Sequence, residues 1–355
     1  MSAPTTVSPG GGATQPTRTR SVRRSRQARS VTVTATIGLV AFALFVVTMM
    51  IGSFALTPWQ VIGSVFRLTE DPSVDFVVRD LRMPVATTGV AVGLAFGVSG
   101  LIFQRLLANP LASPDFVGIS AGASLFAVTT IVIVGGSALV VSGAALAGAL
   151  LAAIAIYLLA WRDGITGYRF ILIGIGVSEL FIALTGYIVA RADLNDAREA
   201  MTWLVGSIGS AGSLELRVLT VAVVVLLPVV LLLARRLGVL ELGDDSAHAL
   251  GVRVETTRLA LLAIAVVLTA LGTAAAGPVA FVALIAGPIA VRLVGSGGAT
   301  LLAAAFVGVV IVLAADLVAQ HLLPVALPTG VVTGAVGAPY LIWLLATVNR
   351  EGRGG

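Results

Sequence analysis

Residues 214–276 read LELRVLTVAVVVLLPVVLLLARR (214–236), LGVLELGDDSAHALGVRVETTR (237–258) and LALLAIAVVLTALGTAAA (259–276). The apolar runs Leu214–Arg236 and Thr257–Ala276 are each long enough to cross a hydrocarbon core of about 30 Å at about 1.5 Å per residue. The charged run between them predicts a short helix, because Gly243 and Asp244 can open it and Gly251 can end it. We therefore expect a polar, cytoplasmic helix held between two membrane spans.

The composition extends this interpretation to the whole chain. Hydrophobic residues make up 58% of the 355 residues, charged residues make up 11%, and the mean hydropathy is +1.05. These values predict an all-α, polytopic membrane protein in contact with lipid. The net charge of +5 does not indicate a nucleic-acid partner, because the basic residues are spread along loops between spans, where topology explains them.

Missing residue types exclude several kinds of chemistry. The chain has no Lys, so its 22 basic residues are all Arg, and neither a P-loop lysine nor a Schiff-base lysine is available. It has no Cys, and His248 and His321 lie far apart in the sequence, so we expect no zinc or haem cluster. We predict no catalytic residues, no cofactor and no metal site, and therefore no enzyme.

Hydropathy divides the chain into three parts. Residues 1–30, rich in Pro, Gly, Ser and Arg, are expected to form a disordered cytoplasmic arm, and residues 350–355 a cytoplasmic tail. Residues 31–349 are expected to form one domain of about ten spans. The first apolar stretch is longer than the core of a cleaved signal and lacks a clear cleavage site, which favours a retained span. The expected spans are 34–56, 84–107, 115–135, 137–160, 170–190, 214–236, 257–276, 279–294, 300–320 and 331–347.

The distribution of Arg orients these spans. With the N-terminus inside, sixteen Arg fall in cytoplasmic segments and six on the opposite side, which together account for all 22. The positive-inside rule requires an excess of basic residues on the cytoplasmic side, as found here. An even number of spans then places both termini in the cytoplasm.

Small residues and two acidic residues stand out within the spans. Gly89, Gly93 and Gly97 recur at every fourth position, a pattern typical of close helix packing. Glu179 and Asp316 lie within expected spans, where a carboxylate is costly and is a candidate for a role in transport. Each could instead be bonded within the bundle. Two isolated acids give little support to the alternative hypothesis, an ion-coupled secondary transporter of a small molecule.

Four ordered motifs cover about residues 35–347. The first runs from Arg82-Met83-Pro84 through Gly93, Gly97, Ser99-Gly100 and Gln104 to Asn109-Pro110-Leu111-Ala112-Ser113-Pro114 and Gly118. The others are Leu242-Gly243-Asp244-Asp245 with Ala247, Leu250 and Gly251; Gly277-Pro278-Val279-Ala280-Phe281-Val282; and Leu327-Pro328 with Gly330, Gly337 and Pro339. Together they closely resemble the FecCD-type permease subunits of iron-siderophore and cobalamin ATP-binding-cassette (ABC) importers. Segment 170–209 looks most like the second permease of ferric catecholate, enterobactin-type importers.

The resemblance implies a ten-helix bundle like that of cobalamin-importer permeases, in the bacterial inner or plasma membrane. It implies two permeases per transporter, ABC ATPase subunits supplied by other chains, an external substrate-binding protein and an iron-siderophore substrate. The coupling helix to the ATPase would contain Leu242, Gly243, Asp244, Asp245, Ala247, Leu250 and Gly251. Arg82 would dock the binding protein. The translocation region would include Gln104, Asn109, Pro110, Pro114, Gly118, Glu179, Gly277 and Pro278.

The chain also departs from this family pattern. Val85 stands where the second Arg of the LR-x-PR signature is expected, and Gln320 stands where some members have an outer Arg. A symmetric dimer would present two weakened docking halves to one binding protein. We therefore expect a heterodimer with a related permease, in which Arg82 supplies the docking charge on this side.

Overall fold

The computed structural model describes residues 16–68, 71–161, 167–295 and 297–351, which form helices and turns with no strand among them. The helices, in chain order, are α1 (Pro16–Met50), α2 (Pro58–Val65), α3 (Pro72–Asp75), η1 (Phe76–Arg82), α4 (Met83–Leu106), α5 (Ile119–Thr129), η2 (Thr130–Val134), α6 (Ala138–Ala160), α7 (Gly167–Arg191), α8 (Leu194–Val205), η3 (Ile208–Ser210), α9 (Ser213–Leu240), α10 (Asp244–Ala249), α11 (Val254–Ala276), α12 (Val282–Val294), α13 (Ala299–Leu317), η4 (Val318–Leu322) and α14 (Thr329–Glu351).

The expected all-helical, polytopic architecture is confirmed. Within the described residues, seven helical segments are long and apolar enough to cross a membrane, and three shorter apolar helices, Ile119–Val134, Val282–Val294 and Thr329–Leu344, accompany them. These segments correspond in chain order to the ten spans expected from hydropathy. Most boundaries agree within a few residues, because hydrocarbon thickness sets the length of an apolar helix locally.

Helix α4 lies at the centre of the bundle, and most of its side chains are buried. Its small residues allow backbones to touch. A Cβ atom added at Gly93 would lie 2.5 Å from Cα of Val309 on α13, and one added at Gly97 would overlap the main-chain oxygen of Ala304. Gly308 on α13 is packed equally closely against the main-chain oxygen of Gly93. The predicted glycine stripe is therefore the seam between α4 and α13.

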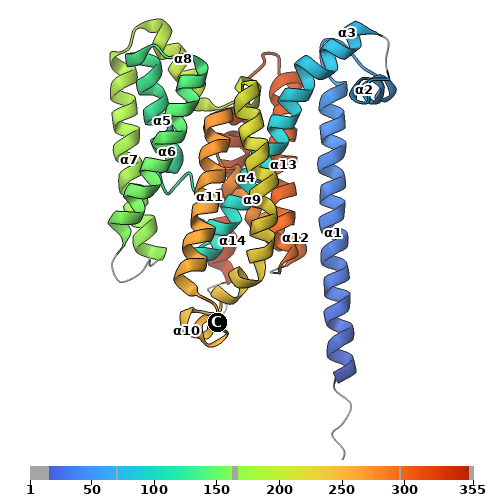
Figure 1. Cartoon of the computed structure of the whole chain (residues 1–355), viewed down its shortest axis with the longest axis vertical. Helices are drawn as coiled ribbons and strands as arrows, with labels where there is room; N and C mark the ends of the chain where they lie inside the picture. The colour runs from blue at the N-terminus through green and yellow to red at the C-terminus, as the bar shows by residue number, and fades with distance from the viewer. Residues whose placement is uncertain (1–15, 69–70, 162–166, 296, 352–355) are drawn as a thin grey trace, which may run out of the picture.

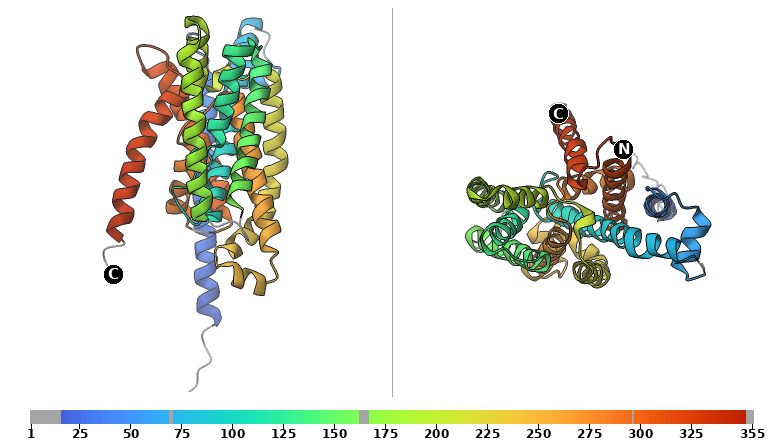
Figure 2. Two further views of the ribbon diagram at one scale, coloured as in Figure 1. Left: turned by 90° about the vertical axis from the view of Figure 1, so that its left-hand side faces the viewer. Right: turned by 90° about the horizontal axis from the view of Figure 1, so that it is seen from above.

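The remaining helices surround this seam. Helices α5 to α8 form a group on one side, and α1 runs along the other side, where Gly38 packs against the ring of Phe306 on α13 (Figure 1). Helix α10 lies at one end of the molecule, which we call the α10 end, and α2, α3 and α8 lie at the opposite end. Helix α1 begins and α14 finishes toward the α10 end (Figure 2).

Two of the differences from the expected boundaries have a local cause. The first span leaves the helix after Met50 rather than at residue 56, because Thr57 and Gln60 form a capping box that starts α2. The third span begins at Ile119 rather than 115, because Gly118 takes a left-handed conformation (φ 97°) at the start of α5. Of the expected N-terminal arm, residues 1–15 lie outside the described residues, and helix α1 already begins at Pro16. In the expected tail, residues 352–355 also lie outside them.

Candidate functional site

The short helix predicted between two spans is present as α10. Gly243 (φ 94°) precedes it and Gly251 (φ 77°) follows it, and glycine adopts such positive φ values without steric cost. The Ala247 N–H donates to the Gly243 oxygen at 3.0 Å, and the Val252 N–H donates to the Ala247 oxygen at 3.0 Å. These bonds close the helix at both ends, so α10 is a compact unit between α9 and α11.

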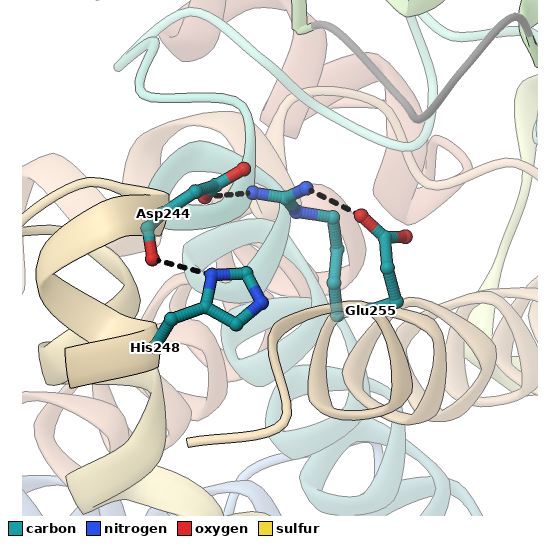
Figure 3. A network of polar contacts seen from close by, with 4 residues as sticks. Asp244, His248 and Glu255 are labelled. Carbon is teal, nitrogen blue, oxygen red and sulfur yellow. Dashed lines mark hydrogen bonds and ion pairs between the residues drawn. The ribbon is translucent and has the colours of Figure 1, made fainter. Parts of the chain in front are cut away.

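An ion network holds α10 to the start of α11 (Figure 3). The guanidinium of Arg258 donates to Oδ1 of Asp244 at 2.8 Å and lies 3.5 Å from Oε1 of Glu255. Nδ1 of His248 lies 2.8 Å from the main-chain oxygen of Asp244. Because both carboxylates are largely exposed, these pairs contribute more to orientation than to stability.

The two faces of α10 differ in exposure. Ala247 is fully buried against the bundle, whereas Leu242 and Leu250, which flank the helix, are each 63% exposed. Asp244 and Asp245 are exposed as well. The exposed leucines and acids form the α10 surface, which we define as Leu242, Asp244, Asp245 and Leu250. Ala247 does not belong to it, so a substitution there would disturb packing and would not test contact with a partner.

A second ion pair joins this segment to the central helix. Nε of Arg105, in the last turn of α4, lies 3.2 Å from Oε1 of Glu241, directly before α10. The side chain of Arg105 is only 9% exposed and that of Glu241 is 33% exposed. No local sequence pattern indicates this pair, because the two residues are far apart in the chain and belong to different helices.

Gln104, next to Arg105, makes a buried contact between helices. Its Nε2 donates to the main-chain oxygen of Leu284 on α12 at 2.9 Å. A side chain at Gly287 would collide with Oε1 of Gln104, so the glycine makes room for the amide. Gln104, predicted as a member of the translocation region, therefore connects α4 to α12 in this structure.

The turn after α4 is stabilised by backbone hydrogen bonds together with its own side chains. Oδ1 of Asn109 accepts from the Leu111 N–H at 2.9 Å, and the Asn109 oxygen accepts from the Ala112 N–H at 3.0 Å. Pro110 is exposed and Pro114 is buried, and the oxygen of Pro114 accepts from the Ile119 N–H. Side-chain bonds of this kind satisfy backbone groups that the helix leaves free.

Three of the four motifs meet in space. The ring of Phe116, in the first motif, packs edge-on against Phe281 in the third, with centroids 6.3 Å apart. Gly337, in the fourth, lies directly against the ring of Phe281. Phe281 has a positive φ of 66°, which is unusual for a bulky residue. The α10 motif is separate from this cluster in the fold.

Gly277 and Pro278 lie at a crossing of three chain segments. A Cβ at Gly277 would lie 2.7 Å from the Trp203 oxygen, and the Ser207 N–H donates to the Ala276 oxygen at 2.7 Å. The Gly330 N–H, at the start of α14, donates to the Gly206 oxygen at 3.0 Å. Glycine is required here by close backbone contact between the ends of α8 and α11 and the start of α14.

The two intramembrane acids lie in different environments. Asp316 is buried, and its Oδ1 accepts from the Thr329 hydroxyl at 2.8 Å, which ties α13 to the start of α14. Glu179 is exposed on α7, although its neighbour Ser178 is buried against Gly118. Asp316 therefore fits the alternative interpretation, in which the acid is bonded within the bundle. Glu179 stays a candidate for contact with water or with another subunit.

Arg82 makes its hydrogen bonds within the chain. Its Nη1 donates to the main-chain oxygens of Met49 at 2.9 Å and Met50 at 3.1 Å, and its Nη2 donates to the oxygen of Phe54. These carbonyls lie at the end of α1 and just beyond it, where a cation is favoured. The predicted docking role of Arg82 stays a prediction, and the structure adds a role in anchoring α1.

A model described as the FecCD transport family matches residues 39–347. The chain belongs to the FecCD transport family. Its relatives include the ferric enterobactin transport system permease protein FepG of Escherichia coli (strain K12), 41% identical over 79% of this chain and 85% of FepG. The achromobactin transport system permease protein CbrC of Dickeya dadantii (strain 3937) is 38% identical over 91% of this chain and 95% of CbrC.

A solved structure shares the fold of this chain. An inward-facing metal-chelate type ABC transporter chain superposes with a TM-score of 0.77 and 25% identity, over 89% of this chain and 99% of that one. The resemblance inferred from the four motifs is thus confirmed for family and fold. For the described residues, no group of three or more His, Cys, Asp and Glu could hold a metal ion.

Proposed function

We propose that this FecCD-family chain is the membrane permease subunit of an ABC importer that carries an iron-siderophore complex inward. ATP would be hydrolysed on a separate subunit, and a substrate-binding protein would deliver the chelate. Family membership supports this function, as do the relatives FepG and CbrC, which are named as permeases for ferric enterobactin and achromobactin transport. An ion-coupled secondary transporter is not favoured, because the relatives are permeases of siderophore and iron uptake systems.

The α10 surface is the observation that carries the coupling proposal. Two leucines, each 63% exposed, flank a short helix whose inner side is fixed by Ala247 and by Arg258. A helix fixed in this way can transmit a displacement as a unit. We assign the α10 surface to the contact with the ATPase subunit, with Gly243 and Gly251 closing the helix.

Substitution at the exposed leucines tests this assignment. Leu242→Ser and Leu250→Ser, combined, should lower retention of the ATPase during purification and abolish ATP-driven uptake, because they remove apolar surface that the contact would bury. Leu68→Ser is the matched control, since Leu68 is 76% exposed near α2, at the opposite end, and this variant should retain the ATPase. Full retention of the ATPase by the double variant would refute the coupling role of the α10 surface.

We also propose that the α10 end faces the cytoplasm, in a bacterial inner or plasma membrane, with both termini on that side. The excess of Arg on this side supports the orientation.

The second permease is a further proposal. Val85 and Gln320 leave the outer end without two arginines expected from the family pattern, so we propose a heterodimer with a related permease. Native mass measurement of a complex formed with the ATPase alone tests this proposal. An active complex with two copies of this chain and no second permease would rule it out.

A further inference from the structure

The last turn of α4 is bonded in two directions. Arg105 pairs with Glu241 on the segment that leads into α10, and Gln104 bonds to Leu284 on α12. Neighbouring residues of one helical turn therefore contact the α10 segment and a core helix. Helix α4 is also packed backbone to backbone on α13 through Gly93 and Gly97, so a force applied at its end acts on a rigid body.

The links that join α10 to the bundle differ in burial. The side chains of the Arg105–Glu241 pair are 9% and 33% exposed, whereas those of the Arg258–Asp244 pair are 15% and 51% exposed. Charges in a partly buried pair are screened less by water and salt. Nη2 of Arg105 is buried and finds no hydrogen-bond acceptor among the described residues. The guanidinium is thus held through Nε and has a donor free for a different arrangement of the segment.

We infer that Arg105 and Glu241 form a coupling strut, a pair of positioning residues through which displacement of α10 moves α4 and, through Gln104, α12. The inference rests on the proposed function, because it concerns how a movement imposed by the ATPase enters the bundle. The strut lies beside α9 and α11, which carry α10 directly. Without it, α10 could shift on its two flanking helices while α4 stayed in place.

The test measures chelate transported per ATP hydrolysed in the complete transporter, reconstituted in liposomes with its ATPase and binding protein. Arg105→Gln and Glu241→Gln should each lower this ratio roughly threefold to tenfold, a range expected when one link of a coupling network is removed. ATPase retention and basal ATP hydrolysis should persist. The exchanged pair, Arg105→Glu with Glu241→Arg, should recover part of the ratio, because it restores opposite charges.

Two controls separate a strut from a purely structural contact. Glu255→Gln removes the more exposed, 3.5 Å partner of Arg258 but leaves the Arg258–Asp244 pair in place, so it should lower the ratio less than either strut variant. A structural defect would lower the thermal midpoint, uptake and ATP hydrolysis together, and charge exchange would not restore coupling. Unchanged ratios in both single variants would overturn the strut while the proposed function stands. Absence of ATP-driven uptake by the unmodified transporter would overturn the proposed function, and the strut with it.

Discussion

Helices α4 and α7 carry similar small residues in opposite surroundings. On α4, Gly93 and Gly97 press against the backbone of α13. On α7, Gly176 and Gly186 would admit a side chain without meeting any described atom within 4 Å, and Glu179 lies exposed between them. Glycines therefore mark a filled seam in one helix and an open face in the other.

The open face of α7 has a consequence for assembly. Gly176, Glu179, Ala183 and Gly186 follow one another at helical spacing, so they share one side of the helix. A carboxylate facing lipid would be costly, which favours a water-filled path or a second subunit at this side. The opposite side of α7 is already occupied, because Gly174 packs against the Val117 oxygen.

The largest expected effect comes from filling the seam. Gly97→Leu should prevent stable folding or cost about 3 kcal/mol or more, because the contacting atoms are backbone and cannot move aside. Gly176→Leu, the matched change on α7, should leave the folded chain intact. Thermal unfolding in detergent, followed by size-exclusion chromatography, measures both. Equal thermal midpoints for the two variants would contradict the difference between the filled seam of α4 and the open face of α7.

Substitution of one polar residue on each helix should have a smaller effect on stability. Gln104→Ala removes the donor to Leu284 and leaves a buried carbonyl without its partner, at a cost of about 1–3 kcal/mol. Glu179→Gln should change stability by less than about 0.5 kcal/mol, because the side chain is exposed. It should nevertheless alter the uptake rate. Normal uptake by this variant would remove Glu179 from the translocation region.

The smallest effect on the fold comes from single thiols in this Cys-free chain. A cysteine at Ala183 on α7 should react with a small maleimide in detergent, whereas one at Ala95 on α4 should not, since Ala95 is 1% exposed. In intact membranes, a cysteine at Ser246 on α10 should react only from the cytoplasmic side and one at Asp193 only from outside. Labelling of both from one side would contradict the proposed arrangement of the spans.

The sequence predicted the spans and the short helix between two of them. Span boundaries at α6, α7 and α9 agree within about four residues because apolar length is a local property of the chain. Helix α10 was predictable for a similar reason, since Gly243 and Gly251 determine where it starts and stops. The motif that contains Asn109 also predicted the turn that separates α4 from α5.

Tertiary structure decided which side chains meet. Gln104 and its partner Leu284 are 180 residues apart, and Arg82 and its partner Met49 are 33 residues apart. No local sequence pattern could reveal such pairs. Burial of Ala247, the Arg105–Glu241 pair and the open face of α7 all depend on how neighbouring helices are rotated and packed. Hydropathy determines that a helix crosses the membrane, but contact with other helices determines which face is filled.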